Sequence, residues 1–252
     1  MKLVIAGYGF VGKAHYELLK DNYDITIVDP AFPEYNQTIP QDADAVIICV
    51  ATPQDEDGSC YMQNVFDVLS YIPSTAQVLI KSTISIEGWD QIKEQFPNHL
   101  ITFSPEFLRA ASAVEDFKKQ TYMYIGGEFD NAVFWEKIFR TVFPQIVIEQ
   151  LGAKEAILIK YFRNSFLATK VAFFNQVYDL CEKLDLPYYV VQRGINSDSR
   201  IGKSHTEVTE ERGFGGHCFP KDTSALVKTA HKNNINLSIL EEAISYNNRI
   251  KQ

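Results

Sequence analysis

A short segment around residue 218 combines a nucleophilic side chain with a backbone that can approach a ligand. From Gly213 to Asp222 it reads GFGGHCFPKD. Glycine permits a close backbone approach, and Pro220 suits the first position of a helix, where its missing N–H costs nothing. A cysteine at a helix N-terminus, with Lys221 three residues on, has the surroundings that lower a thiol pKa and make a nucleophile. A lone cysteine of this kind is more often a buried thiol behind a loop, so the assignment of Cys218 as a nucleophile depends on how the whole ten-residue run is interpreted.

Three glycines near the N-terminus predict a dinucleotide site. Gly7, Gly9 and Gly12 directly follow an apolar strand and open a helix, with Phe10 and Val11 between the last two. In such a loop the first glycine makes the tight turn, the second lets a pyrophosphate approach, and the third packs helix against strand. The alternative is a glycine-rich turn that binds nothing.

A carboxylate follows at the position that selects the cofactor. Asp29 lies 22 residues after Gly7, at the end of the second predicted strand. A carboxylate there accepts from both ribose hydroxyls of NAD and repels the additional phosphate of NADP. Thr52 and the pair Ser82–Thr83 follow later strands, where the cofactor should run. We therefore predict NAD as the cofactor.

The first half of the sequence alternates strand and helix signals. This alternation predicts a Rossmann-type, doubly wound parallel sheet over residues 1–150, an α/β domain that binds NAD. Strands are expected at Lys2–Ala6, Asp24–Val28, Ala45–Val50, Gln77–Ile80, Leu100–Phe103, Thr121–Ile125 and Ile146–Glu149, and helices at Val11–Lys20, Gln63–Tyr71, Ile86–Gln95 and Asp130–Thr141.

The second half has a different character. The segment Ala153–Leu184 contains no glycine or proline, and its apolar residues recur at helical spacing, so it predicts one long helix. Residues 151–252 should form an all-α domain that carries the catalytic cysteine. The long helix has more apolar surface than such a domain can cover, so we expect a homodimer. The apolar residues in question are Phe166, Leu167, Val171, Phe173 and Phe174, and the further helices are expected at Tyr188–Gly194, Pro220–Lys232 and Leu237–Asn248.

Composition excludes several classes of partner. The chain has 252 residues, 46% of them hydrophobic, and a net charge of −8 with no basic block. We therefore expect neither nucleic acid nor a membrane as a partner. The N-terminus shows no leader pattern, which predicts a cytoplasmic protein. The four cysteines form no CxxC pair, so neither a disulfide framework nor a metal site is expected.

Three segments together resemble one enzyme family. The GFGGHCFPKD run is similar to the active-site segment of the UDP-glucose and GDP-mannose dehydrogenase family, and Phe219 fits its UDP-glucose branch better. The run from Ser104 to Arg109 resembles the family's SPEFLRE segment, and Lys160 to Lys170 resembles its central helix. The resemblance covers essentially the whole chain.

The resemblance implies a role for individual residues. Thr52, Ser82 and Thr83 would lie along NAD, with Thr83 near the reacting carbon. Lys160 would stabilise an oxyanion, and Asn164 would help to place water and sugar. Further roles are implied for Asp222 as partner of the cysteine and its water, for Glu106 in thioester hydrolysis, and for Phe107, Leu108, Phe214 and Gly215, with Glu106, Lys160 and Asn164, in substrate binding.

The implied reaction is a four-electron oxidation. C6 of a UDP-hexose, with UDP-glucose as the expected substrate, would lose a hydride to NAD and form an aldehyde. Cys218 would add to it, and a second hydride transfer would leave a thioester. Water, activated by Glu106 or Asp222, would release the carboxylate. Two NADH per product are the signature of this reaction.

Some features depart from the family pattern. Ala110 stands where a second glutamate is usual, and Ile86–Glu87 replace a proline-rich turn. Family members continue into a third domain that holds UDP, whereas this sequence stops at Gln252. The expectation is weak UDP-sugar binding unless a partner chain supplies that domain. Two alternatives stay open: a two-domain NAD-dependent dehydrogenase of the hydroxyacid type, and an NAD-binding subunit with impaired catalysis.

Overall fold

The computed structural model describes residues 1–55, 57–216 and 218–251, so His217 of the GFGGHCFPKD segment lies outside the described residues. The chain forms two compact units. The first comprises Met1–Asp55 and Cys60–Lys160, and the second comprises Glu56–Ser59 and Tyr161–Gln252. The functional division at residues 150 and 151 remains a prediction.

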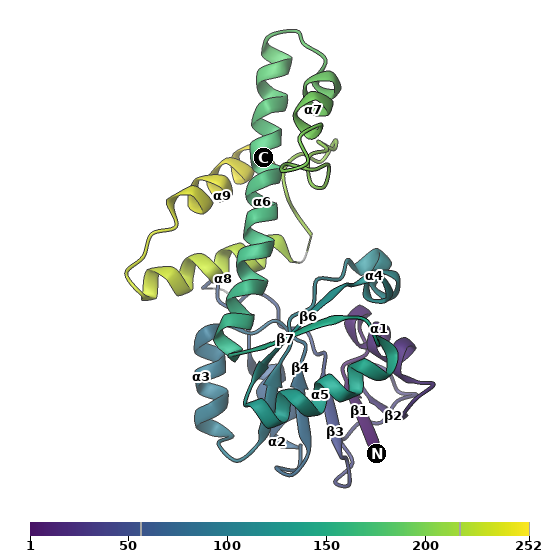
Figure 1. Cartoon of the computed structure of the whole chain (residues 1–252). Coiled ribbons are helices and arrows are strands. Elements are labelled where there is room, and N and C mark those ends of the chain that lie inside the picture. Colours follow the sequence, from purple (N-terminus) through teal and green to yellow (C-terminus); the bar gives the residue numbers. More distant parts are fainter. Residues whose placement is uncertain (56, 217, 252) are drawn as a thin grey trace. The chain divides into compact units, whose positions relative to one another are not determined.

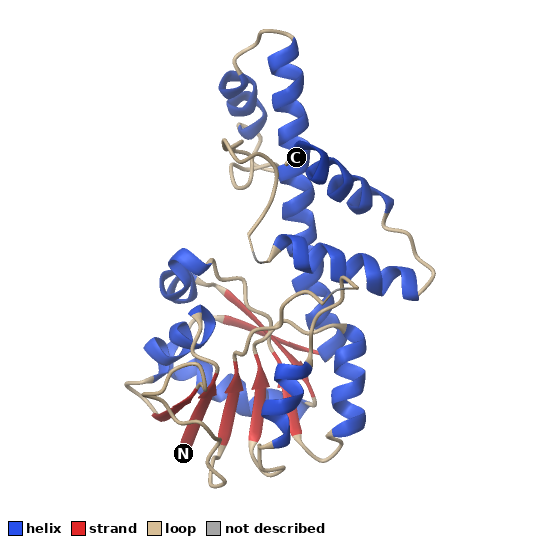
Figure 2. Cartoon of the chain, turned by 180° about the vertical axis from the view of Figure 1, so that it is seen from behind, coloured by secondary structure: helices blue, strands red, loops and turns tan. Residues whose placement is uncertain are grey.

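One sheet organises the first unit (Figures 1 and 2). Over the described residues it has seven strands in the order β2-β1-β3-β4-β5-β6-β7. All neighbours are parallel except β5 and β6, which pair antiparallel. The strands are β1 Lys2–Ala6, β2 Asp24–Val28, β3 Ala45–Ile48, β4 Gln77–Ile80, β5 Leu100–Phe103, β6 Tyr122–Gly127 and β7 Val147–Leu151.

Helices cover both faces of this sheet, as a doubly wound fold requires. One face packs against α1 (Phe10–Leu19), α4 (Ala113–Lys119) and α5 (Phe129–Val142), whose apolar residues form one core with alternate residues of the strands. The opposite face carries α2 (Gln63–Ser70) and α3 (Ile86–Gln95), which Figure 2 shows from that side. Because both faces are covered, β3 and β4 are apolar almost without interruption.

The order of the strands identifies the edge of the sheet at which a ligand is expected. The chain runs from β1 to β2 on one side and then to β3 on the other side of β1. In open parallel sheets, ligands bind outside the carboxyl ends of the strands where the order reverses in this way. The glycine loop after β1 and the Thr52 segment after β3 therefore lie at the expected edge.

The second unit is helical. The long helix α6 spans Ala153–Lys183 and ends before Pro187, and α7 spans Tyr188–Asn196. Helix α8 (Phe219–Lys232) begins directly after Cys218, and α9 (Ser238–Ile250) follows it. Residues of α6 and α9 form a small core around Phe214, which comes from the loop between α7 and α8. None of the described helices is long and apolar enough to cross a membrane.

The predicted fold class is confirmed, and the differences are local. The last part of the sheet is not wholly parallel, because β6 runs antiparallel to β5. Helix α4 was not predicted: it is only seven residues long and buries only Ala113 and Phe117, too short a pattern to recognise. Strand β3 ends at Ile48 rather than Val50, although the Cys49 N–H still donates to Ala6 O.

Candidate active site

The glycine loop has the geometry that a pyrophosphate site needs. Gly7 has φ +93°, and a Cβ there would lie 2.7 Å from the backbone carbon of Cys49. A Cβ on Gly12 would lie 2.0 Å from Gly7 O and 3.3 Å from a side-chain carbon of Ile5, so α1 packs closely against the turn after β1 and against β1 itself. Gly9, by contrast, has open space where a side chain would be. That space lies at the N-terminus of α1, where the backbone N–H groups favour an anion.

Asp29 is fixed beside this loop. Its Oδ2 accepts a hydrogen bond of 2.7 Å from the backbone N–H of Tyr8, and its Oδ1 accepts one of 3.0 Å from Ala31. The carboxylate is thus oriented at the end of β2, and each oxygen has a further lone pair for a ribose hydroxyl. The loop and the carboxylate both fit NAD. Phe10 and Val11 open α1, and Val11 is buried in the core below the loop.

The two threonine segments lie together at the same edge of the sheet. The Cys60 thiol lies 3.2 Å from Thr83 O and 3.9 Å from Thr52 O, which brings the two residues close to one sulfur. Ser82 is buried, and its hydroxyl donates to Val50 O at 2.7 Å. Ser82 thus joins the ends of β3 and β4 through its side chain.

Glu106 and Lys160 form a buried ion pair within the first unit. Lys160 Nζ lies 2.8 Å from Glu106 Oε1 and also donates to the backbone oxygen of Glu106 at 2.6 Å. The other carboxylate oxygen, Oε2, accepts from the N–H of Leu108 at 2.7 Å. Both side chains are less than 10% exposed. The ammonium predicted to hold an oxyanion and the carboxylate predicted to act on water are therefore direct partners.

In the SPEFLR segment (Ser104–Arg109), Phe107 lies beside this pair, whereas Arg109 has a different partner. Lys160 Nζ lies 5.5 Å from the centre of the Phe107 ring, close enough for a cation–π contact. Arg109 turns outward and forms a two-pronged pair with Asp116 of α4. Ala110, which replaces the expected glutamate, begins a short 3₁₀ helix after Arg109.

Cys218 lies at the N-terminus of α8. It is the N-cap residue and half-buried, and its carbonyl accepts from the N–H of Asp222 at 2.8 Å. Helix N-termini carry a partial positive charge that favours a thiolate. All four cysteines are free thiols.

Asp222 has two side-chain partners in the second unit. Its Oδ2 accepts a hydrogen bond of 2.6 Å from the Asn164 amide, and its Oδ1 pairs with Lys221 Nζ at 2.7 Å. Both Asp222 and Asn164 are buried. Lys221 therefore turns to the carboxylate, and the predicted effect of its charge on the thiol stays a prediction.

A network of side chains that the sequence did not reveal holds the loop before the cysteine. Arg212 contacts two residues of α6: its Nε donates to Asn175 Oδ1 at 2.8 Å, and it pairs with Asp179. The same Asn175 oxygen accepts from the N–H of Gly213. Asn247 of α9 accepts from the N–H of Phe214 at 2.6 Å. These four contacts join loop residues to helices that are more than thirty residues away in the sequence, so no local pattern reveals them.

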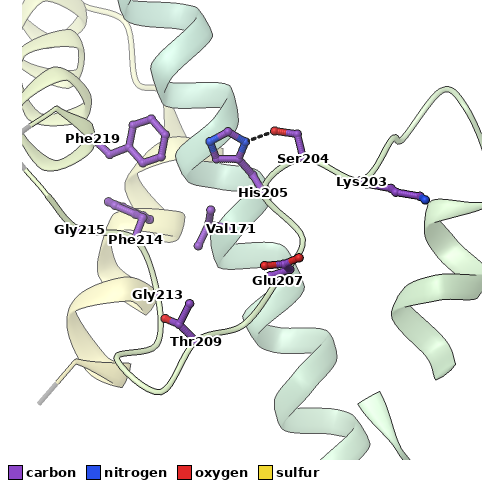
Figure 3. Close-up of a pocket in the computed structure, with 10 residues that line it drawn as sticks. All are labelled: Val171, Lys203, Ser204, His205, Glu207, Thr209, Gly213, Phe214, Gly215 and Phe219. Carbon is purple, nitrogen blue, oxygen red and sulfur yellow. Dashed lines mark hydrogen bonds between the residues drawn. The ribbon is translucent and has the colours of Figure 1, made fainter. Parts of the chain in front are cut away.

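A cavity of about 440 Å³ opens beside this loop (Figure 3). Phe214, Gly215 and Phe219 line it from the cysteine segment, and Val171 lines it from α6. Its remaining wall comes from the loop between α7 and α8, where Ser204 and His205 are hydrogen-bonded to each other. Two of the predicted substrate-binding residues, Phe214 and Gly215, thus border a space large enough for part of a ligand.

The predicted residues fall into two groups, one in each unit. The first unit brings together the glycine loop, the threonine segments and the Glu106–Lys160 pair. The second brings together Asn164, Asp222 and the helix that Cys218 begins. Lys160 and Asn164 lie one helical turn apart on α6, which is continuous from Ala153 to Lys183.

One buried lysine was missed in the sequence. Lys81 follows β4 directly, is 3% exposed, and donates from Nζ to the hydroxyl of Ser104 and the carbonyl of Pro105. Burial lowers its pKa to about 8. The position of a charged residue immediately after an apolar strand was the one feature of the sequence that could have indicated this buried lysine.

Two models of one protein family match the chain. The NAD binding domain of the UDP-glucose/GDP-mannose dehydrogenase family matches residues 31–147, and the central domain of the same family matches residues 154–249. The glycine loop and Asp29 precede the first matched range, so their assignment depends on the geometry given above.

Individual relatives agree with this match. A UDP-glucose 6-dehydrogenase of Rickettsia felis is 36% identical over 228 residues, which cover 84% of this chain and 49% of the relative. The UDP-glucose 6-dehydrogenase YwqF of Bacillus subtilis is 34% identical over 218 residues, covering 82% and 49%. The chain therefore spans about half the length of these curated relatives.

Solved structures show the same fold. A UDP-glucose dehydrogenase from Pyrobaculum islandicum superposes with a TM-score of 0.85 at 25% identity, over 98% of this chain and 68% of that one. A 3-hydroxyisobutyrate dehydrogenase of Mycobacterium tuberculosis shares the fold with a TM-score of 0.74 at 17% identity, over 97% and 92%. Because both domain models of one family match in order along the chain, the protein belongs to the UDP-glucose/GDP-mannose dehydrogenase family, and its cofactor is NAD.

Proposed function

We propose that this chain carries the catalytic residues of a UDP-hexose 6-dehydrogenase that converts UDP-glucose to UDP-glucuronate through a thioester on Cys218. The observation that carries the proposal is the arrangement in the second unit. Cys218 begins α8, and Asp222, one turn later, is bound to Asn164 of α6. The names of the Rickettsia and Bacillus relatives support UDP-glucose as the substrate.

The residues of the chain would supply the covalent chemistry. When bound, NAD accepts hydrides from C6 of the sugar, one from the alcohol, whose hydroxyl proton is released, and a second, taken by another NAD, that converts the Cys218 adduct to the thioester. The Cys218 sulfur would add to the resulting aldehyde carbon, and the ammonium of Lys160 with the amide of Asn164 would hold the oxyanion. For this, Lys160 Nζ must share its hydrogens between Glu106 and the substrate, and an ammonium has three.

Hydrolysis of the thioester needs a proton acceptor for water. Glu106 and Asp222 are the two candidates, and each already accepts two side-chain or backbone hydrogen bonds. These bonds hold the carboxylate oxygens in fixed positions, and a general base must lie within hydrogen-bond reach of the water it acts on. We propose that one of them acts on the water, and the variants Glu106→Gln and Asp222→Asn would distinguish them by which one accumulates the thioester.

We further propose that the cavity beside Phe214 and Gly215 takes part of the nucleotide sugar. Phe107 and Leu108 would contact the sugar end from the SPEFLR segment. One face of α6 is apolar and exposed: Phe166 and Phe173, seven residues apart on it, are 69% and 56% exposed. We propose that this face pairs with a second copy of the chain.

The test of the function is stoichiometric. Purified protein is incubated with NAD and UDP-glucose, and the NADH formed is counted per sugar consumed. The proposed enzyme forms two. One NADH would indicate the hydroxyacid type, for which the fold shared with the Mycobacterium enzyme is the only support. No NADH, with NAD bound, would indicate a subunit impaired in catalysis, to which Ala110 would contribute.

A further inference from the structure

Lys81 is a buried amine in the same cluster as the Glu106–Lys160 pair. Its backbone N–H donates to Ile48 O at 2.8 Å, which fixes it at the end of β4 beside β3. Its Nζ donates to Ser104 Oγ at 3.0 Å and to Pro105 O at 3.2 Å. Ser104 is fully buried. Both acceptors are neutral groups, a side-chain hydroxyl and a backbone carbonyl, and both belong to the two residues that precede Glu106.

Burying an amine in this way lowers the stability of the folded chain, so a functional reason for it is worth seeking. Burial disfavours the charged form, and the nearby ammonium of Lys160 acts in the same direction, so the pKa of Lys81 is lowered to about 8. Glu106 and the Cys49 thiol act the other way. An apolar side chain of similar length would fill the same volume without this penalty.

Two amines therefore hold one short segment from two sides. Lys81, from the end of β4, binds residues 104 and 105, while Lys160, from α6, binds the carbonyl and the carboxylate of Glu106. The position of the Glu106 carboxylate relative to Lys160 is set in part by the backbone of the two residues that precede it. We propose that Lys81 is a positioning residue that fixes the Ser104–Pro105 backbone and sets the Glu106 carboxylate against Lys160.

The proposal predicts electrostatic coupling as well as positioning. The charged groups that face Lys81 are Glu106 after β5, Lys160 on α6 and the Cys49 thiol after β3, and Lys81 also lowers the pKa of His15 on α1. The charge on Lys160 lowers the pKa of Lys81 and the charge on Glu106 raises it, so removing either charge must move the pKa of Lys81, and removing Lys81 must raise the pKa of His15.

The first experiment measures this coupling without any catalysis. Lysine labelled with ¹³C at Cε is incorporated into the whole chain, and the Cε signals are titrated by NMR in the wild type, Lys160→Met and Glu106→Gln, with Lys81→Met identifying the Lys81 signal. In Lys160→Met the Lys81 titration should move to higher pH, because the charge that lowers its pKa is removed. Lys154→Met, which removes an exposed lysine of the same helix, should leave it unchanged.

A second variant covers the case in which Lys160→Met does not fold. In Glu106→Gln the Lys81 signal should move to lower pH, because the carboxylate raises the pKa of Lys81. A Lys81 signal that does not move in the folded variants would overturn the proposal.

The second experiment concerns catalysis and rests on the proposed function. Lys81→Met should lower kcat for NADH formation at least tenfold, leave the affinity for NAD unchanged, and shift the alkaline limb of the pH profile upward. Lys81→Arg, which keeps the charge and the donors, should recover part of the rate. Wild-type protein without turnover would count against the proposed function alone, because the titration still decides the role of Lys81. Equal kcat values and pH profiles in Lys81→Met and wild type would count against Lys81.

Discussion

The side-chain amide of Asn164 donates a hydrogen bond of 2.6 Å to Oδ2 of Asp222, and both residues are buried. Asn164 comes from α6, and Asp222 lies in the first turn of α8. This bond ties the long helix to the helix that Cys218 begins. A hydrogen bond to a buried carboxylate is strong, and its loss would leave Lys221 as the remaining side-chain partner given above for Asp222.

Replacing this amide by a second carboxylate should destabilise the second unit. In Asn164→Asp two buried carboxylates would meet and could not both ionise, so one pKa would rise. A raised carboxyl pKa gives stability at low pH that is lost as the pH increases. We expect a loss of about 3 kcal/mol at pH 8 and a smaller loss at pH 5, measured by thermal unfolding.

The swapped double variant is the control. Asn164→Asp combined with Asp222→Asn restores one amide and one carboxylate, so it should recover most of the lost stability. A double variant as unstable as Asn164→Asp alone would show that the pair does not couple the helices.

Removal of the Cys218 thiol should interrupt the reaction after its first oxidation. Cys218→Ser should bind NAD normally but stop at the aldehyde or at an ester that does not hydrolyse. Intact mass spectrometry of quenched wild-type reactions should reveal a sugar-acyl adduct on Cys218. The matched control is Cys181→Ser, which alters a buried thiol of α6. Complete turnover by Cys218→Ser would exclude the assignment.

Substitutions in the glycine loop should affect stability and NAD affinity to different degrees, depending on the position. Gly9→Ala places a methyl group in open space, so stability should stay within about 0.5 kcal/mol. NAD affinity should nevertheless fall roughly tenfold, about 1.4 kcal/mol, because the pyrophosphate must pass there.

Gly12→Ala should behave in the opposite way. Its Cβ would lie 2.0 Å from Gly7 O, and such overpacking costs about 1–3 kcal/mol or more in stability. Calorimetry of NAD binding and denaturant unfolding of both variants test this contrast. Unchanged NAD binding in Gly9→Ala would mean that the cofactor does not use this loop.

The buried His15 should make stability depend on pH. Burial lowers its pKa to about 3, and its Nε2 has no hydrogen-bond partner among the described residues. The unfolded chain therefore binds a proton near pH 6.5 that the folded chain does not, so stability falls as the pH drops below that value.

We expect a loss of about 1 kcal/mol from this group between pH 6.5 and 5.5. Urea unfolding of His15→Leu should have a flatter pH dependence in this range than the wild type. His231→Gln, which changes an exposed histidine paired with Glu241, is the control. An equally steep dependence in His15→Leu would refute the assignment.

The exposed face of α6 should govern association. Phe166→Glu introduces a charge where we propose that a second copy packs, so sedimentation at micromolar concentration should show monomers in place of dimers. Phe129→Glu on α5 alters an equally exposed phenylalanine outside that face and should leave the dimer intact. A wild-type protein that is monomeric would contradict the proposal.

Local patterns in the sequence determined much of this protein. The spacing of the three glycines and the position of Asp29 specified the dinucleotide loop, and the structure places both at the predicted strand ends. The absence of glycine and proline from Ala153 to Leu184 specified α6, which ends within one residue of its predicted end. Each of these signals lies in residues close along the chain, where helix and strand periodicities act.

Tertiary structure alone decided the partners of the candidate site. Asn164 and Asp222 are 58 residues apart, and Lys160 and Glu106 are 54 apart. The periodicity of one segment states which face is buried but not which distant side chain it meets, because that depends on strand register and on the closure of long loops. For the same reason the reversed direction of β6 and the buried amine of Lys81 beside Ser104 emerged only from the folded chain.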